Sequence, residues 1–334
     1  MLARTRFLVA VALVAAPAVA GQALAQPVEP TPLRLEAKIP LGEVRGRIDH
    51  IAVDLARQRL FVAELGNDSV SVVDIKNHKV LRRISGLKEP QGVGYVASTD
   101  TLYIANAGDG SLRLFRGENY ADEARINLGD DADNIRVDAE SNRVIVGYGG
   151  GALAMIDAAA HNKVADIPLK GHPESFQLSR DGKEIFVNVP NAREIAVIDR
   201  SMGKQVASWP MRNATGNFPM ALDEEAGRLF TVFRYPAKLG VFALPDGKVV
   251  AAADTCRDAD DVFDDAKRQR LYVSCGDGSL DVMDPQGTFR RIARIPTVAG
   301  ARTALFVPDL DRLFLAVRAE RGEAASIWMF RPLP

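Results

Sequence analysis

Four carboxylates stand at matching points of a repeated sequence pattern, and their chemistry indicates a shared site. Each lies at the start of a short apolar segment, and they are Asp49, Asp133, Glu174 and Asp260. Carboxylate oxygens are the ligands that hard divalent cations prefer. We therefore predict a site for a divalent cation or a cationic ligand, with these four residues as the metal ligands. A divalent cation is the only cofactor that the sequence favours.

The aligned positions of the other repeats widen this candidate site. The predicted ligand-binding set is Asp49, His50, Gln91, Asp133, Asn134, Glu174, Asp260, Asp261 and Arg302. The set thus contains five acidic residues, one histidine and one arginine. Since one arginine cannot neutralise five carboxylates, a cation or a positively charged ligand is the complement that we expect. Alternatively, Arg302 anchors a ligand carboxylate through two parallel hydrogen bonds.

His50 is the candidate general base, because histidine is the side chain that titrates near neutral pH without perturbation. A histidine beside an aspartate is also a common structural pair, and that interpretation stays open. His172 falls near the same site, one step further out. The sequence has no His-x-x-x-His or Cys-x-x-Cys pair, no haem-attachment motif, no Gly-x-Ser-x-Gly and no phosphate-binding loop. These absences exclude the usual zinc, covalent haem, serine-hydrolase and nucleotide sites.

The elements that must bring these residues together are short strands in seven repeats. An apolar pair marks the second strand of each repeat, and the pairs are Leu60-Phe61, Leu102-Tyr103, Val144-Ile145, Ile185-Phe186, Leu229-Phe230, Leu271-Tyr272 and Leu313-Phe314. Their first members are 42, 42, 41, 44, 42 and 42 residues apart. A period in the low forties built only from short strands is typical of propeller blades. We predict an all-β fold, a seven-bladed β-propeller of four-stranded blades.

In this fold, the two ends of the chain are expected to supply strands to the same blade. The last repeat stops at the strand 326–330, and only four residues follow it. The stretch Leu33–Ile39 is a spare strand at the other end, so we predict that it closes the ring as the missing outer strand. Closure in this way removes exposed sheet edges.

The propeller would gather the candidate residues around one end of a central channel. Each innermost strand begins at one of the aligned positions, so residues far apart in sequence become neighbours around a funnel-shaped mouth. Two other interpretations stay open. Channel mouths carry polar residues that only face water, and the same surface is suited to docking a protein.

The first 25 residues have the pattern of a secretory signal peptide. Arg4 and Arg6 precede the apolar stretch 7–20, and Ala23-Leu24-Ala25 gives a cleavage site after Ala25. No later stretch reaches the roughly 20 apolar residues of a membrane span. We expect a periplasmic or secreted protein with no membrane span.

We expect residues 26–32 to form a disordered, proline-rich lead-in and residues 33–334 to form a single domain, present as a monomer. Without the two arginines of the signal peptide, the 42 basic residues fall to 40, against 43 acidic residues. Nucleic-acid binding needs a basic stripe, so a nucleic-acid partner is disfavoured. The partner that we expect at the funnel is a small molecule or a protein.

Cys256 and Cys275 are the only cysteines, and both belong to the sixth repeat. Cys256 precedes an innermost strand and Cys275 ends the strand that returns beside it, so both fall at the funnel end. Because disulfides persist in exported proteins, we predict that the two cysteines are bonded. Two buried thiols are the alternative.

The repeats resemble the YVTN β-propeller family of YncE-like exported proteins. The resemblance rests on phrases such as Arg59-Leu60-Phe61-Val62 and Gly66-Asn67-Asp68-Ser69-Val70, and it covers residues 33–330. It implies the propeller fold, and propellers host enzymes as well as pure binding scaffolds.

Three functional hypotheses follow. The first is an exported scaffold that binds a ligand, a cation or a protein at the funnel. The second is a metal-assisted enzyme of the lactonase or lyase kind with His50 or an aspartate as the base. The third is an accessory subunit of a periplasmic redox or envelope complex. The lack of a second well-placed histidine weighs against the enzyme.

Overall fold

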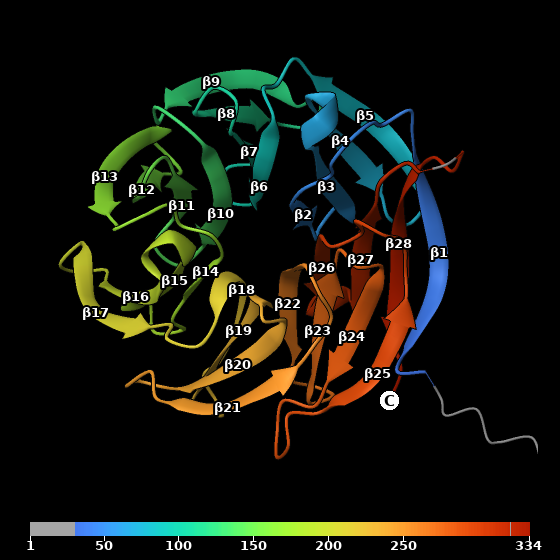
Figure 1. The fold of residues 1–334 in the computed structure, drawn as a ribbon. Coiled ribbons are helices and arrows are strands. Elements are labelled where there is room, and N and C mark those ends of the chain that lie inside the picture. The colour runs from blue at the N-terminus through green and yellow to red at the C-terminus, as the bar shows by residue number, and fades with distance from the viewer. Residues whose placement is uncertain (1–30, 321) are drawn as a thin grey trace, which may run out of the picture. The chain divides into compact units, whose positions relative to one another are not determined.

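The computed structural model describes residues 31–320 and 322–334, which form a ring of seven four-stranded antiparallel sheets (Figure 1). The predicted signal peptide and residues 26–30 of the predicted lead-in lie outside the described residues. The seven sheets follow one another along the chain, which confirms the predicted seven-bladed propeller. No helix in the described part of the chain is long and apolar enough to cross a membrane.

The first six blades each use four consecutive strands, with the innermost strand first. Blades 1 to 3 consist of β2 (Ile51–Asp54), β3 (Arg59–Glu64), β4 (Ser69–Asp74) and β5 (Lys79–Ser85); β6 (Pro90–Val96), β7 (Thr101–Asn106), β8 (Ser111–Arg116) and β9 (Ala121–Asn127); and β10 (Ala132–Asp138), β11 (Arg143–Tyr148), β12 (Ala152–Asp157) and β13 (Asn162–Pro168). Blades 4 to 6 consist of β14 (Phe176–Leu178), β15 (Glu184–Val189), β16 (Glu194–Asp199) and β17 (Lys204–Pro210); β18 (Thr215–Asp223), β19 (Arg228–Tyr235), β20 (Lys238–Ala243) and β21 (Val249–Asp254); and β22 (Ala259–Asp265), β23 (Arg270–Cys275), β24 (Ser279–Met283) and β25 (Arg291–Pro296). Three single-turn 3-10 helices, η1 (Leu65–Asn67), η2 (Pro190–Ala192) and η3 (Pro308–Leu310), connect strands.

The seventh blade contains strands from both ends of the chain. Its order is β26 (Ala304–Val307), β27 (Arg312–Val317), β28 (Ala325–Pro332) and β1 (Leu33–Gly42). β1 runs antiparallel to β28, with Leu33 opposite Pro332 and Ile39 opposite Ile327. The predicted ring closure is therefore confirmed, and Figure 1 shows β1 as the outer strand beside β28.

Apolar layers between neighbouring blades make up the core. Between blades 1 and 2, for example, Phe61, Val70 and Val72 pack with Leu102 and Ile104. The two middle strands of a blade are covered on both faces, since each blade lies between two others. This explains why the second strands are near-continuous apolar runs rather than alternating ones.

Two arginines join neighbouring blades at the turns that follow the innermost strands. Arg57 donates hydrogen bonds to both carboxylate oxygens of Asp100, each at 2.7 Å. Arg268 contacts Asp311 in the same way, at 2.7 and 2.8 Å. The planar guanidinium matches a carboxylate in this paired geometry. The Arg-Gln-Arg-Leu phrase that begins at both positions thus has a structural role.

Candidate functional site

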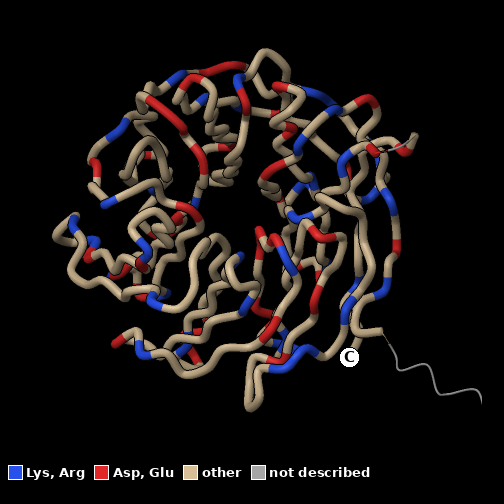
Figure 2. The backbone as a smooth tube through the Cα atoms, viewed as in Figure 1, with Lys and Arg blue, Asp and Glu red and all other residues tan. Residues whose placement is uncertain are grey.

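The candidate residues lie at one end of the ring, where the innermost strands begin. Asp49 and His50 precede β2, Gln91 lies in β6, Asp133 and Asn134 lie in β10, Glu174 precedes β14, Asp260 and Asp261 lie in β22, and Arg302 precedes β26. We call this set, together with Arg47, Asp131, His172, Arg234 and Asp258, the funnel. Figure 2 shows acidic and basic positions interspersed around the ring rather than separated onto two sides.

Blade 2 contributes little to the funnel because its innermost strand lies very close to that of blade 3. A Cβ atom on Gly92 would lie 1.8 Å from the carbonyl oxygen of Asp133, so only glycine fits there. The amide of Gln91 reaches only Asp131, at 3.5 Å. Asn134 is buried beneath the mouth.

Histidines and aspartates from blades 1, 3 and 4 form a chain across the funnel. Nε2 of His50 lies 3.8 Å from Asp49 and 3.5 Å from Oδ1 of Asp133. Nε2 of His172 lies 3.6 Å from the other oxygen of Asp133, and its Nδ1 lies 3.5 Å from Asp131. Asp133 is therefore shared between two imidazoles.

The charges in this chain favour protonated histidines. Burial lowers the pKa of His50, but its contact with Asp133 and the charge of Asp49 outweigh burial and raise the pKa to about 9. Burial also lowers the pKa of His172, but its contacts with Asp133 and with the carbonyl oxygen of Gly149 outweigh burial and raise the pKa to about 9. Burial raises the pKa of Asp133, but His172 and His50 outweigh it and hold that pKa well below its usual range. A histidine protonated at neutral pH is a donor, which does not suit the predicted role of His50 as a general base.

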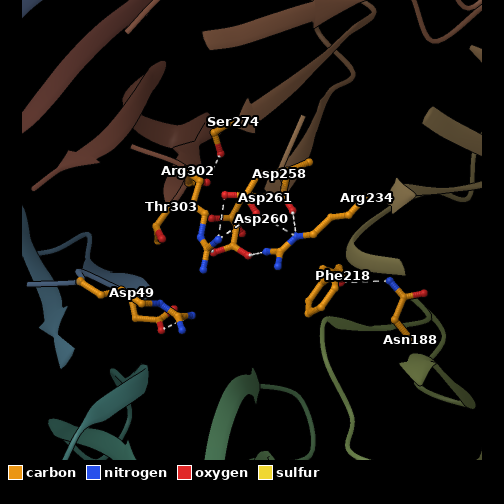
Figure 3. A network of polar contacts seen from close by, with 12 residues as sticks. Asp49, Asn188, Phe218, Arg234, Asp258, Asp260, Asp261, Ser274, Arg302 and Thr303 are labelled. Atoms are coloured by element: carbon orange, nitrogen blue, oxygen red, sulfur yellow. Dashed lines mark hydrogen bonds and ion pairs between the residues drawn. The ribbon is translucent and has the colours of Figure 1, made fainter. Parts of the chain in front are cut away.

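Two arginines and two aspartates form a second cluster on the side of blades 5 to 7 (Figure 3). Arg302 lies 2.9 Å from Asp258 and 3.1 Å from Asp260. Arg234 contacts both aspartates as well, at 3.3 Å for Asp258. The guanidinium carbon of Arg234 also lies 3.8 Å from the ring centre of Phe218, a cation–π arrangement. Figure 3 shows the two arginines approaching the aspartates from different sides.

Local structure positions this second cluster. Cys256 and Cys275 form a disulfide with their Cα atoms 5.9 Å apart, which confirms the predicted bond. The bond ties the segment that carries Asp258 to the end of β23. A Cβ atom on Gly276 would lie 2.0 Å from a carboxylate oxygen of Asp258, so this glycine makes room for the side chain.

Glu174 and Asp261 are carboxylates of the funnel without an ion-pair partner in residues 31–320 and 322–334. The side chain of Glu174 is half-buried and makes no hydrogen bond there, whereas Asp261 accepts one from the backbone N–H of Ala304 at 2.8 Å. Burial raises the pKa of each to about 7. Oδ1 of Asp133, a residue only 7% exposed, accepts no well-aligned hydrogen bond.

The channel continues from the funnel into a cavity of about 380 Å³. His50, Arg136, Gln177 and Asp261 are polar residues of its lining. Most other lining side chains are apolar, among them Val53, Val93, Ile135, Val137, Phe263 and Leu305. The site therefore combines charged groups at its mouth with an apolar interior.

The four predicted metal ligands do not form one cluster. No group of three or more His, Cys, Asp or Glu side chains among the described residues is arranged to hold a metal ion. Asp49 contacts Arg47 at 2.7 Å, Asp133 contacts two histidines, and Asp260 contacts two arginines. The geometry gives no support to the metal hypothesis.

Comparison with known proteins bears on the architecture. No family model matches the chain, and no curated protein matches it. Among solved structures, hydrazine synthase of Kuenenia stuttgartiensis is similar, with a TM-score of 0.73 and 18% identity over 82% of this chain and 94% of that chain. The chain is a seven-bladed β-propeller. At this identity the likeness shows the fold alone.

The charge balance expected from the sequence was wrong, because the propeller brings further cations to the funnel. Arg47, His172 and Arg234 all contact funnel aspartates, and none occupies an aligned position. The signal for Arg234 was its place in Arg234-Tyr235-Pro236, where the first, second, third and sixth repeats have a glycine turn. In the structure β19 runs on to Tyr235, and this extension carries Arg234 into the funnel.

Proposed function

We propose that this propeller is an exported binding protein of the YVTN kind whose funnel holds a small ligand with a cationic group. The YVTN assignment rests on the repeated sequence phrases. Export rests on the predicted signal peptide, and the Cys256–Cys275 disulfide is compatible with it, since disulfides persist outside the reducing cytosol.

The observation that carries the proposal is the unpaired carboxylate of Glu174. Arg234 and Arg302 are matched by Asp258 and Asp260. The two protonated histidines are matched by Asp131 and Asp133, and Arg47 by Asp49. Two acids remain without a cation: Asp261, which accepts a backbone hydrogen bond and lines the cavity, and Glu174, which is half-buried and makes no hydrogen bond in the described residues. Such a group either takes up a proton or pairs with a cation that is supplied from outside.

An organic cation suits this arrangement better than a metal ion. A divalent metal needs several oxygen ligands within about 2.6 Å of one point, and the funnel acids other than Glu174 and Asp261 are already paired with separate cations. An ammonium group needs only one or two carboxylates and a few acceptors. Glu174 offers such a carboxylate at the mouth, and Oδ1 of Asp133 accepts no well-aligned hydrogen bond.

The test is a thermal-shift panel of alkylamines, choline, amino acids, sugars, lactones and the chlorides of calcium, magnesium, manganese and zinc. An ammonium compound should raise the melting temperature, by the equivalent of about 2.7 kcal/mol at a hundredfold excess over Kd. Glu174→Gln should abolish this response. Glu225→Gln is the matched control, since Glu225 is exposed and lies in the turn between β18 and β19.

Three outcomes would overturn the proposal. In the first, no ammonium compound stabilises the protein. In the second, Glu174→Gln responds like the wild type. In the third, a divalent metal stabilises the protein and Asp260→Asn removes that effect, which would restore the metal hypothesis.

A further inference from the structure

Arg136 is a part-buried cation of the central channel without an acidic partner in contact. It lies in β10 and lines the 380 Å³ cavity below the funnel. No carboxylate of the described residues lies within 4.0 Å of its guanidinium nitrogens. Arg57, Arg234, Arg268 and Arg302, which are also part-buried, each contact at least one carboxylate. Three further part-buried arginines, Arg59, Arg228 and Arg270, donate to neutral oxygens instead. Arg136 differs from these three because it lines the central cavity.

Neutral groups hold the guanidinium of Arg136 in place. It donates to the carbonyl oxygen of Ile135 at 2.9 Å and to the hydroxyl of Ser175 at 3.2 Å. The ring of Phe176 lies 5.3 Å from its central carbon. A guanidinium has five N–H donors, so these bonds orient it and leave donors free. None of them neutralises its charge.

Partial burial makes this charge costly, because no carboxylate contacts it. It lowers the pKa of Arg136, while the more distant charges of Asp261 and Asp133 oppose the shift. A buried cation is normally retained where an anion or another function requires it. Because Arg136 lines a cavity, that anion can come from a ligand.

The position of Arg136 relative to Glu174 defines the ligand further. Ser175, which bonds Arg136, directly follows Glu174 in the chain. A free carboxylate and a free guanidinium are therefore supplied by neighbouring positions, one at the mouth and one in the channel. The rest of the cavity is mainly apolar and, at about 380 Å³, falls in the range of small-ligand pockets.

We propose that the ligand is a small zwitterion with an apolar body, such as an apolar α-amino acid, whose carboxylate is bound by Arg136. Its ammonium group pairs with Glu174, and its apolar part lies in the channel. This inference rests on the proposed function, because it takes the same site and adds the anion-binding group.

Isothermal titration calorimetry of the full mature chain tests the inference with matched compounds. L-leucine and L-phenylalanine carry both charges, 3-methylbutylamine and 2-phenylethylamine lack the carboxylate, and the N-acetyl amino acids lack the ammonium. The wild type should bind an amino acid at least tenfold more tightly than its matched amine. Arg136→Gln should remove this preference by weakening amino-acid binding alone, and Arg136→Lys should keep part of it.

Controls separate this inference from the proposed function. Arg82→Gln, on the exposed face of β5, should bind like the wild type, and thermal unfolding checks that Arg136→Gln is folded. If amine and amino acid bind the wild type equally, or if Arg136→Gln keeps the preference, the inference is overturned while the proposed function stands. If neither class binds, both fail.

Discussion

Asp133 is the carboxylate that lies between the two histidines of the funnel. It is buried, and an imidazole approaches each of its two oxygens. A buried carboxylate stays ionised only while cations compensate it. The charge state of the funnel therefore depends on both histidines keeping their protons.

The stability of the protein should depend on pH through His50. Its pKa is about 9 in the folded protein against an ordinary value of 6.5. The stabilisation is fully present below pH 6.5 and is lost as the pH rises through 9. Between pH 6 and pH 9, urea unfolding should show the wild type losing about 2 kcal/mol more than His50→Gln. The exposed turn variant His78→Asn should follow the wild type, and equal losses in wild type and His50→Gln would contradict the assignment.

Arg234 should stabilise the fold through its aspartates. Arg234→Gln leaves Asp260, whose side chain is 12% exposed, with Arg302 as its remaining partner, so the free energy of unfolding should fall by about 2 kcal/mol. Asp260→Asn should cost less in the Arg234→Gln background than alone, because the two residues interact directly. Strict additivity in this double-mutant cycle would show that the ion pair contributes nothing.

Alignment of the repeats predicted that Asp49, His50 and Asp133 lie where innermost strands begin. It did not predict which side chains they contact. Backbone position follows from the repeat. The reach of a long side chain from a neighbouring segment does not, and Arg47 enters the funnel from a loop and Arg234 from the extended end of β19 in that way. The acids appeared unbalanced in the sequence for this reason.

At the level of strands, β1 is the element on which ring closure depends. It buries Leu33, Ile39 and Leu41 and pairs along its length with β28. Without β1, the backbone groups of β28 on that side would form an open sheet edge. Such an edge pairs readily with other chains.

Removal of β1 should therefore make the protein aggregate. A chain that starts at Pro40 lacks most of β1, whereas a chain that starts at Thr31 keeps it and serves as the control. Size-exclusion chromatography should show a monomer for the longer chain and aggregates, with a lower melting temperature, for the shorter one. Identical elution and melting of the two chains would refute the closing role of β1.

The strands could be predicted because a propeller repeat is strongly patterned. The apolar second strand and the glycine turn after it recur at an almost constant spacing, and the truncated last repeat indicated the partner of Leu33–Ile39. The fourth repeat has Pro190-Asn191-Ala192 in place of the glycine turn, and in the fifth Arg234-Tyr235-Pro236 replaces it and β19 continues instead. That extension depends on contacts with Phe218 and Asp260, which lie in other segments.

At the level of the whole ring, the funnel is a product of closure. Blades 1, 3, 4, 5, 6 and 7 supply its charged groups, and the cavity below it is lined by residues from blades 1 to 4, 6 and 7. No single repeat supplies all of these described residues. For this reason, no motif within one segment of the sequence indicates the site. The charged groups and the apolar cavity come together only in the closed ring.

The central claim is that Glu174 accepts a cationic ligand group, and the pH dependence of binding tests it most directly. The ligand for calorimetry is 3-methylbutylamine, or the ammonium compound with the largest thermal shift, provided that it keeps its charge between pH 6 and pH 8. Because the pKa of Glu174 is about 7, the ligand must displace a proton at pH 6 but not at pH 8. Affinity should rise about tenfold from pH 6 to pH 8 in the wild type and stay weak and constant in Glu174→Gln. Equal affinity at both pH values, or unchanged binding in Glu174→Gln, would contradict the account.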